Sequence, residues 1–255
     1  ISYPAIPALD AERTDTTMEV DTLINGINKT IFATTDDDLK PMMKGIFFNI
    51  DNDKITYVAS DSHKLVKYTT GCKGEIKASF ILPKKPANLL KGLLLREEED
   101  VKLSFDKNNA IFTLKNYTLV CHLIEGNYPN FKAVIPQNNG VAVKVSKSEL
   151  LDSVNRASLM ANKTTSLLKL SVGDSVMGIE AHDMDFSTKA SENVKVEKTG
   201  ADVTIGVKSE FFATCLGIVG AEDVVLRLGD ERRPVLFEDS LCKDRVMLVM
   251  PMMIN

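Results

Sequence analysis

Asp61 and His63 lie two residues apart in the stretch VASDSHKL (58–65), and a carboxylate close to an imidazole is a pairing that general acid–base catalysis uses. The sequence contains no serine or cysteine nucleophile motif, no second histidine at a useful spacing and no Gly-rich phosphate loop. We therefore interpret His63 as part of a binding surface or of the structure. An enzyme with a site around Asp61, His63 and Asp183 is the alternative.

Carboxylates and thiols elsewhere in the chain could bind a metal ion. Asp36–Asp38 is a run of three carboxylates, but it lacks the alternating ligands and the glycine of a calcium loop, which favours a solvated loop between a helix and a strand. The cysteines are scattered without paired spacing, and the histidines show no ligand spacing. Reduced structural thiols are expected rather than a disulfide set or a zinc site. The sequence predicts no metal and no cofactor.

The last nine residues, MLVMPMMIN (247–255), are unusually apolar for the end of a chain. A C-terminus is normally solvated and mobile. Such a run is expected to be a core strand, a docked tail or a surface that receives another molecule. Because an apolar stripe is more often core, these residues by themselves favour a final core strand.

Composition bounds the class of protein. The 255 residues are 44% apolar and 26% charged, which fits one or two soluble globular domains. No apolar run approaches the roughly 20 residues of a membrane span and no signal segment opens the chain, so a cytoplasmic location is the default. Ile1 in place of a methionine suggests that the sequence begins inside a longer protein. A net charge of −4 argues against a generally basic nucleic-acid binder, although a locally basic face is compatible with it.

The sequence contains an internal duplication. ILPKKPANLLKGLLLREEEDVKL (81–103) is similar to TIGVKSEFFATCLGIVGAEDVVL (204–226), an alignment that places Lys85 on Lys208 at the start of a helix in each copy. Upstream, ITYVASDSH (55–63) aligns with MGIEAHDMD (177–185). Collinear matches of this kind indicate two copies of one domain.

Each copy is expected to contain a strand, an amphipathic helix, a set of strands, a second amphipathic helix and further strands. Alternating stretches such as 54–60 and 101–105 predict strands, and Ser146 is placed to cap a helix. Strands outnumber helices without βαβ alternation, so the fold class is α+β, with tandem duplicated domains of mainly antiparallel sheet and two helices each. SYPAIP (2–7) is similar to the end of the first copy, NYPNFKAVIP (127–136). The predicted divisions are 1–8 as the tail of a preceding domain, 9–137 as one domain and 138–255 as the next.

Several motifs resemble one family, the bacterial DNA polymerase III beta subunit, which is a sliding clamp. The motifs are VASDSHKL (58–65), EGNYPNFKAVIP (125–136), RPVLF (233–237) and VMPM (249–252), which stand at the family's separations along the whole chain. The sequence departs from the family's pattern at Ser62, where glycine is usual, at Lys64, where arginine is usual, at Ala133, where a basic residue is frequent, and at the ending Met253–Asn255. These departures affect the shape and charge of a pocket rather than the assignment.

The resemblance implies a DNA clamp fold and a function that is not enzymatic. In the family, three similar domains per subunit and two subunits joined head to tail form a ring around duplex DNA, which gives the polymerase processivity. The chain would then correspond to the second and third domains with the first domain absent. A homodimer is implied for the full-length protein and a monomer for this chain alone.

The resemblance also implies a hydrophobic cleft that receives short linear peptides from the replicative polymerase, the clamp loader and repair proteins. Methionine suits such a surface, because its unbranched, polarizable side chain can repack around different apolar groups. The implied peptide-binding residues are Ser60, Ser62, His63, Lys64, Leu65, Pro129, Val134, Phe211, Pro234, Val235, Leu248, Met250, Pro251 and Met252.

Sequence-independent DNA contacts are implied for a set of lysines, although each lysine taken alone is better interpreted as an ordinary solvated surface charge. The set is Lys40, Lys84, Lys85, Lys132 and Lys208. Leu159 and Met160, near the end of a helix, match positions of the subunit interface and would be exposed in this chain; otherwise they belong to the core at a helix end. A third class of function is a structural scaffold that binds partners through its acidic face.

Overall fold

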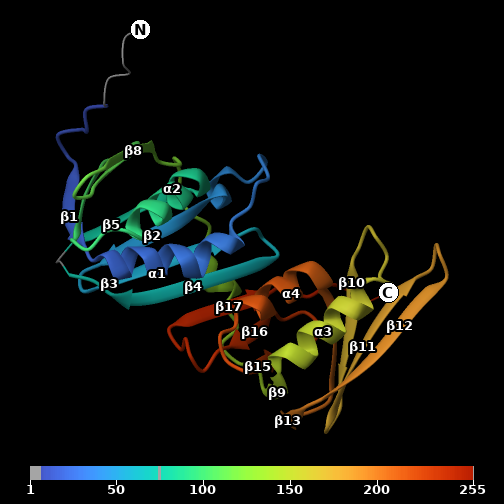
Figure 1. Cartoon of the computed structure of the whole chain (residues 1–255). Coiled ribbons are helices and arrows are strands. Elements are labelled where there is room, and N and C mark those ends of the chain that lie inside the picture. The colour runs from blue at the N-terminus through green and yellow to red at the C-terminus, as the bar shows by residue number, and fades with distance from the viewer. Residues whose placement is uncertain (1–6, 74–75, 255) are drawn as a thin grey trace. The chain divides into compact units, whose positions relative to one another are not determined.

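The computed structural model describes residues 7–73 and 76–254, so the SYPAIP stretch lies outside the described residues apart from Pro7. The chain divides into two compact units. The first unit holds the described residues up to Asp61 together with Val66–Asn130, and the second holds Ser62–Leu65 together with the described residues from Phe131 onward. Figure 1 shows helices and strands in both units.

The first unit follows the predicted order of strand, helix, strands, helix and strands. Its elements are β1 (Thr14–Met18), α1 (Val20–Thr30), β2 (Gly45–Asp51), β3 (Lys54–Ser60), β4 (Lys64–Gly71), β5 (Lys77–Pro83), α2 (Lys84–Leu94), β6 (Val101–Phe105), β7 (Asn109–Thr113) and β8 (Thr118–His122), with 3₁₀ turns at Ile31–Ala33 and Pro41–Lys44. The first two residues of β4 belong to the second unit. The strands predicted over 54–60 and 101–105 are confirmed as β3 and β6.

Two antiparallel sheets and a pair of helices form the core of the first unit. One sheet has the order β1-β6-β7-β8, and the order β5-β2-β3-β4 occurs in the other. Helix α1 packs against α2 and β3. The fully buried Tyr57 of β3 donates a hydrogen bond from its hydroxyl to the carbonyl of Thr22 at 3.0 Å. A side chain at Gly26 would lie 2.2 Å from the Tyr57 ring, so α1 can approach β3 because glycine stands there.

The second unit repeats this order. Its elements are β9 (Val141–Ser146), α3 (Lys147–Ser158), β10 (Leu167–Val172), β11 (Val176–Asp183), β12 (Thr188–Lys195), β13 (Glu197–Thr199), β14 (Val203–Lys208), α4 (Ser209–Ile218), β15 (Asp223–Leu228), β16 (Val235–Glu238) and β17 (Arg245–Val249), with a 3₁₀ turn at Phe131–Val134. The predicted cap of α3 is confirmed, since the Ser146 hydroxyl accepts a hydrogen bond from the Glu149 N–H at 3.4 Å.

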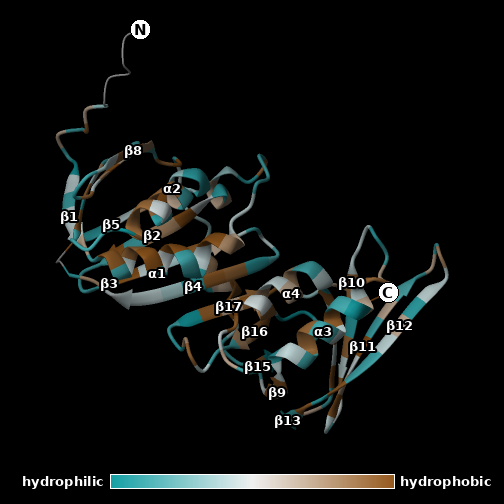
Figure 2. Cartoon of the chain, in the orientation of Figure 1, coloured by the Kyte–Doolittle hydropathy of each residue, from teal (hydrophilic) through white to brown (hydrophobic). Residues whose placement is uncertain are grey.

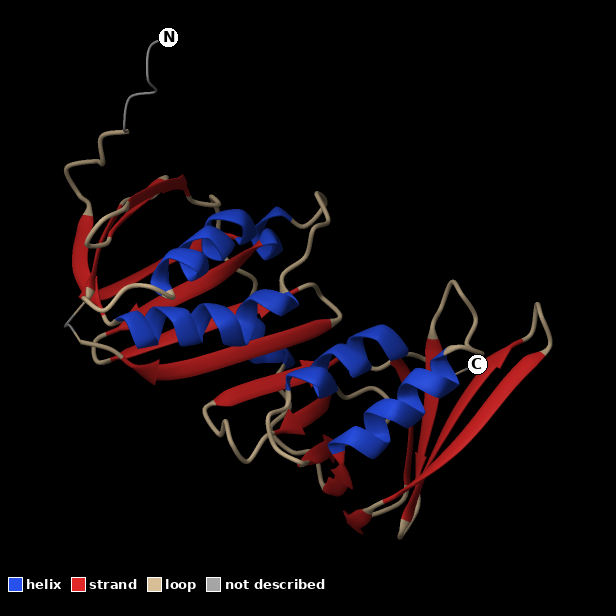
Figure 3. Ribbon diagram, viewed as in Figure 1, coloured by secondary structure: helices blue, strands red, loops and turns tan. Residues whose placement is uncertain are grey.

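The sheets of the second unit have the orders β12-β11-β10-β14 and β13-β9-β15-β16-β17, and the pairs are antiparallel. Helices α3 and α4 pack against each other, and α3 also contacts β10, β11 and β12. Apolar and polar residues follow one another along α1 and α3 (Figure 2), as expected of amphipathic helices that cover a sheet. Helices lie over strands in both units (Figure 3), and the α+β class with antiparallel sheets is confirmed.

The duplication is visible in the structure, but the alignment that equates Lys85 with Lys208 is wrong. Lys208 precedes α4 and pairs with Leu167, whereas the residue that precedes α2 and pairs with Gly45 is Pro83. Lys85 therefore corresponds to Glu210. The loop over residues 95–100 after α2 is longer than the loop over 219–222 after α4. An ungapped sequence alignment that matches the strands after these loops therefore places α2 and α4 out of register with each other.

Candidate functional site

The C-terminal segment, defined here as Met250–Ile254, is fixed at two points within the second unit. Strand β17 ends at Val249, and the next N–H, that of Met250, donates to the His63 carbonyl at 2.7 Å. The Met252 N–H donates to the Gly206 carbonyl on β14 at 2.8 Å. Because Gly206 has no Cβ, the segment can cross β14 closely; a Cβ there would lie 2.4 Å from the Met252 carbonyl oxygen. The apolar chain end is thus a docked tail.

Side chains of this segment are only partly covered. Met250, Pro251 and Met252 are half-buried, whereas Met253 is 66% exposed. The last strand before them is core, with Leu248 fully buried. The interpretation of the whole run as a core strand therefore holds for β17 and not for the residues after it.

Phe211, in the first turn of α4, is surrounded by three nitrogen-bearing side chains. The His63 ring stacks on it with centroids 5.0 Å apart and planes 13° apart. The Nζ atoms of Lys64 and Lys208 lie 4.8 and 4.9 Å from its centroid, within cation–π range. We call His63, Lys64, Lys208 and Phe211 the Phe211 cluster. It belongs entirely to the second unit.

The lysines of the Phe211 cluster differ in exposure. Lys64 is only 8% exposed, whereas the Lys208 side chain is 29% exposed and forms an ion pair with Glu210 at 2.6 Å. Ser62, next to His63, has a φ of 79°, a left-handed conformation that glycine adopts without strain. This explains in physical terms why glycine suits the turn that positions His63.

The structure brings together many, but not all, of the residues implied for a peptide cleft. His63, Lys64 and Phe211 are in contact, and Met250 is hydrogen-bonded to His63. Four other residues implied for the cleft are buried in the protein instead of lying on its surface. These are Leu65, Pro234, Val235 and Leu248. Val134 is 39% exposed in the 3₁₀ turn that opens the second unit. Ser60 and Pro129 belong to the first unit, where Ser60 is buried and Pro129 is half-buried.

The lysines implied for DNA contacts have different surroundings. Lys84, at the start of α2, pairs with Asp36 at 2.7 Å, and the Lys40 Nζ donates to the Asp61 carbonyl at 3.1 Å. Lys85 and Lys132 are exposed. Asp36–Asp38 is an exposed loop, as predicted, in which Asp38 pairs with Lys44. No group of metal-binding side chains was found among the residues that the structure describes.

The pair Leu159 and Met160 is exposed, at 74% and 41%, after the end of α3. Two further apolar side chains, Met184 and Phe186, are 78% and 75% exposed in the turn between β11 and β12. The Thr188 hydroxyl donates to the Met160 carbonyl at 3.3 Å, which ties this turn to the helix end. The sequence interpretation missed Met184 and Phe186. Two large apolar residues within the polar stretch HDMDFST (182–188) could have indicated exposed apolar side chains in a turn.

The alternative enzyme site is not assembled within either unit. The Oδ1 atom of Asp183 accepts hydrogen bonds from the N–H groups of Asp185 and Phe186 and lies 3.4 Å from the Asn162 amide nitrogen. Asp183 therefore stabilises the turn that follows β11. His63 instead stacks on Phe211, and Asp61 belongs to the first unit. We therefore do not favour the enzyme interpretation around Asp61, His63 and Asp183.

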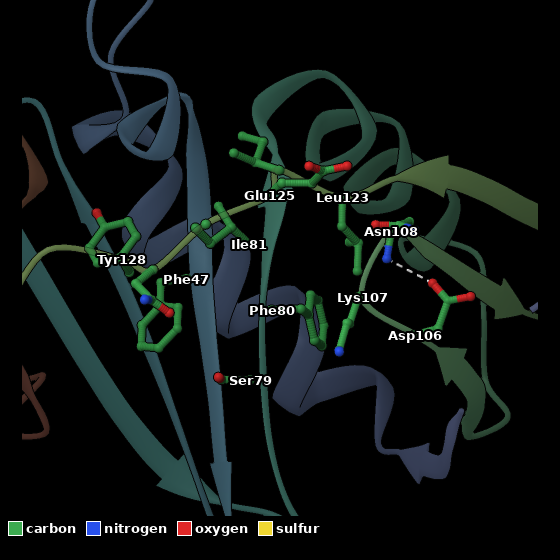
Figure 4. A pocket seen from close by; sticks show the side chains of 13 residues that line it. Phe47, Ser79, Phe80, Ile81, Asp106, Lys107, Asn108, Leu123, Glu125 and Tyr128 are labelled. Atoms are coloured by element: carbon green, nitrogen blue, oxygen red, sulfur yellow. Dashed lines mark hydrogen bonds between the residues drawn. The ribbon is translucent and has the colours of Figure 1, made fainter. Parts of the chain in front are cut away.

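The first unit contains a cavity of about 510 Å³ beside the segment that follows β8. Phe47, which stacks on Tyr128 with centroids 5.0 Å apart, lines one part, and the turn around Lys107 lines another (Figure 4). The Ile124 N–H donates to the Ile81 carbonyl at 3.0 Å and holds that segment over β5. The cavity shares no lining residue with the predicted cleft or the predicted DNA contacts.

Two consecutive domain families match the chain. Residues 17–130 match the central domain of the DNA polymerase III beta subunit, and residues 132–253 match the C-terminal domain of the same protein. The chain belongs to the DNA polymerase III beta subunit family. The resemblance that the sequence motifs indicated is thereby confirmed, and the chain is a member of the sliding clamps. Within the part that the structure describes, no helix has the length and apolar character to cross a membrane.

Individual relatives agree with this assignment. A beta sliding clamp from Staphylococcus aureus is 24% identical over 252 residues, which cover 98% of this chain and 66% of the relative. One from Pseudomonas aeruginosa is 23% identical over 228 residues, covering 89% and 62%. The chain thus spans about two-thirds of the length of these curated relatives.

Solved structures show the same fold. The DNA polymerase III subunit beta from Pseudomonas aeruginosa matches with a TM-score of 0.92 at 22% identity, covering 99% of this chain and 69% of that one. The Thermotoga maritima beta subunit matches with a TM-score of 0.90 at 23% identity, covering 99% and 69%. A Pseudomonas aeruginosa sliding clamp bound to griselimycin matches with a TM-score of 0.92 at 22% identity, covering 99% and 68%. The sliding-clamp fold is confirmed.

Proposed function

We propose that the protein is part of a ring-shaped clamp that encircles duplex DNA and tethers the replicative polymerase and other partners through short linear peptides. The main support is that both matching domains follow one another in the chain, together with the docked C-terminal segment beside the Phe211 cluster. Such a clamp gives processivity by holding proteins on DNA and needs no catalytic residues or cofactor. A role on bacterial DNA implies a cytoplasmic location.

Peptide capture is proposed for the surface that Met250–Met252 and the Phe211 cluster form within the second unit. Half-buried methionines can adapt to different apolar side chains, and an aromatic ring offers a rigid platform. The griselimycin-bound relative supports a ligand site in this family of structures. The clamp loader and repair proteins are proposed to use the same surface in turn.

Ring formation is proposed through the exposed apolar group Leu159, Met160, Met184 and Phe186 and through β12, which lies at the edge of its sheet. An edge strand presents unpaired N–H and C=O groups that another chain can complete. The full-length protein would be a homodimer, and this chain alone a monomer. Sedimentation of this chain tests the second statement.

DNA contacts are proposed for lysines near the helices, through phosphates and without sequence preference. Lys84 and Lys85 open α2, whereas Lys208 is engaged by Glu210 and by the Phe211 ring. Lys208 is therefore better assigned to the peptide surface than to DNA.

The decisive experiment is fluorescence anisotropy of a labelled peptide of the glutamine-leucine-x-leucine-phenylalanine type, titrated with this chain and with a version that ends at Val249. That truncation keeps β17 complete and removes the C-terminal segment. We expect saturable binding that is lost on truncation.

The matched control is Leu241→Ala, which removes a 75% exposed apolar side chain of the same unit outside the segment. It should leave peptide binding unchanged. No binding by the intact, folded chain would refute the peptide site, and partner binding that survives truncation and is sensitive to salt would favour a scaffold with an acidic face.

A further inference from the structure

Strand β5 lies at the edge of its sheet in the first unit, with β2 on its inner side. In an antiparallel pair, the main-chain N–H and C=O groups of alternate residues point toward the partner strand, and those of the residues between them point away. The Ile81 carbonyl points away from β2, because it accepts the Ile124 N–H at 3.0 Å. The main-chain groups of Lys77 and Ser79 alternate with the same period and therefore point to the same outer edge.

Most of this outer edge is unpaired. Within the part of the chain that the structure describes, the bond from Ile124 is the one main-chain hydrogen bond made to it, so the N–H and C=O groups of Lys77 and Ser79 have no protein partner. Such groups repeat about every 6.6 Å along a strand, a spacing that another extended chain matches over its length. A compact small molecule satisfies at most one of these residues. The edge therefore fits a strand better than a small ligand.

The cavity of about 510 Å³ beside this edge leaves room for the side chains of an added strand. Side chains along a strand point alternately to opposite faces, and the cavity is lined from both faces of β5, by Phe80 on one and by Ser79 and Ile81 on the other. Figure 4 shows Lys107 reaching toward Phe80, and Tyr128 on the side of β5 where Ile81 lies. Alternate side chains of an added strand thus meet two different surroundings.

Lys107 provides the charge on the Phe80 side. It is exposed, and it forms no ion pair with the described residues. The neighbouring Asp106 carboxylate is already engaged by three main-chain N–H groups. The other carboxylate of the lining, Glu125, is exposed next to the point where Ile124 crosses β5. An acidic side chain is therefore favoured beside Lys107 and disfavoured beside Glu125.

We infer that the outer edge of β5 is a docking site for an extended segment of a partner protein. The segment adds to the sheet as a further strand, places an acidic side chain beside Lys107 and directs apolar side chains toward Ile81 and Tyr128. This surface shares no residue with the C-terminal segment or the Phe211 cluster, so the inference does not rest on the peptide-binding function proposed for them.

The probe is a labelled, end-capped peptide with the sequence threonine-valine-aspartate-valine-threonine, compared with the same peptide carrying asparagine in place of aspartate. Binding is measured by anisotropy, and hydrogen exchange of the Ser79 amide is followed in the saturated complex. We expect the aspartate peptide to bind about two- to five-fold tighter than the asparagine peptide, less so at high salt, and the Ser79 amide to become protected.

Two variants test the two parts of the inference. Ser79→Pro removes an N–H that points away from β2, a place where an edge strand tolerates proline, and it should abolish saturable binding of both peptides. Lys107→Gln should make the two peptides bind equally. Lys102→Gln, which changes an exposed lysine of β6 outside the cavity, is the matched control and should change nothing. Hydrogen exchange and Lys107→Gln keep the test decisive if Ser79→Pro lowers stability.

Three results would overturn the inference: no binding of either peptide at millimolar concentration, binding that leaves the Ser79 amide unprotected, or a preference for aspartate that persists in Lys107→Gln. Self-association of the chain that Ser79→Pro abolishes would also overturn it, because the occupant of the edge would then be a second copy. The version that ends at Val249 should bind these peptides like the whole chain, so failure here is distinguishable from failure of the peptide-binding surface on the second unit.

Discussion

The second helices of the two units occupy the same place in the duplicated fold and present different chemistry. Helix α2 begins with Lys84 and Lys85 and carries Lys91 further along, whereas α4 has no basic residue and begins with Ser209, Glu210 and Phe211. Both helices bury the face that packs on their own sheets. Duplication has kept the buried face and changed the outer one, which fits a proposed division of labour between DNA contacts and peptide capture.

The segments after the last strand of each unit are also equivalent. In the first unit the Ile124 N–H donates to the Ile81 carbonyl of β5, and in the second the Met252 N–H donates to the Gly206 carbonyl of β14. In the first unit this crossing runs on through Glu125 and Gly126 along the cavity of Figure 4. In the second it ends the described chain and leaves methionines half-exposed, so the same crossing serves as part of a surface.

The two units also differ in how deeply an ion pair near the loop after the second helix is buried. In the first unit the Glu97 carboxylate accepts from the Lys115 N–H, and Lys115 pairs with the exposed Glu99 at 2.7 Å. In the second unit the equivalent turn contains Asp239, which accepts from the Gly220 N–H and pairs with Arg245 at 2.8 Å. The side chains of that pair are only 3% and 6% exposed. In both copies the loop after the second helix is hydrogen-bonded to the turn before the last strand, but the ion pair at that contact is exposed in the first unit and buried in the second.

The largest effect is expected from breaking the buried pair. Asp239→Asn leaves the Arg245 guanidinium buried without its counter-charge, which should lower the free energy of unfolding by about 3 kcal/mol. Denaturant titration measures this change. The matched variant Glu99→Gln in the first unit should leave the unfolding midpoint unchanged, because both partners are solvated. Equal effects of the two variants would contradict the contrast in burial.

The same pair predicts a pH dependence. Burial raises the pKa of Asp239, but hydrogen bonds from the Gly220 and Leu241 N–H groups and the Arg245 charge outweigh it, so the pKa lies below its ordinary value. The ionised carboxylate therefore stabilises the fold fully above the unfolded pKa of about 3.9, and this contribution is lost as the pH falls through the folded value. Asp239→Asn should remove that part of the acid sensitivity.

An intermediate effect is expected at the crossing over β14. In Gly206→Ala the new Cβ would lie 2.4 Å from the Met252 carbonyl oxygen, so the C-terminal segment has to move away. We expect peptide affinity to fall about tenfold, or about 1.4 kcal/mol, in the anisotropy measurement. Gly217→Ala in α4 is the control, because a Cβ there meets nothing within 4 Å and peptide affinity should not change. Unchanged affinity in Gly206→Ala would separate the docked segment from the site.

Local patterns were enough to predict the order of elements, the cap at Ser146 and the α+β class, because each depends on residues close in sequence. The register of the second helices was not predictable in the same way. It depends on the lengths of the loops at 95–100 and 219–222, and matching strands beyond them concealed the difference.

The candidate site was predicted in part, and largely through the resemblance to the family. That resemblance implied His63, Phe211 and Met250, which the structure does bring together. The role of Gly206 could not be predicted, because it appears only when the C-terminal segment lies across β14. The ion pair between Lys208 and Glu210 likewise could not be assigned to the site from the sequence, because its connection to the site is the contact of Lys208 with the Phe211 ring.

The smallest effect is expected at the start of α2, where the contrast with α4 can be tested directly. Replacing Lys84 and Lys85 together by Gln should weaken binding to duplex DNA by about two- to three-fold per lysine, in line with exposed charge pairs. If both lysines contact phosphates, the slope of log affinity against log salt should become shallower by about 0.9 for each. Binding is measured by anisotropy of a labelled duplex over a salt series.

Phe211→Ala is the matched change at the start of α4, and each variant serves as the control for the other. Phe211→Ala should reduce peptide affinity and leave DNA affinity and its salt slope unchanged. The variant with both lysines replaced should leave peptide affinity unchanged. Because Lys84 also pairs with Asp36, the single variant Lys85→Gln shows whether the lost DNA affinity follows from charge or from a disturbed loop. If both helices affected both ligands, the outer faces of α2 and α4 would not have diverged in function, and the difference in their sequences would need another cause.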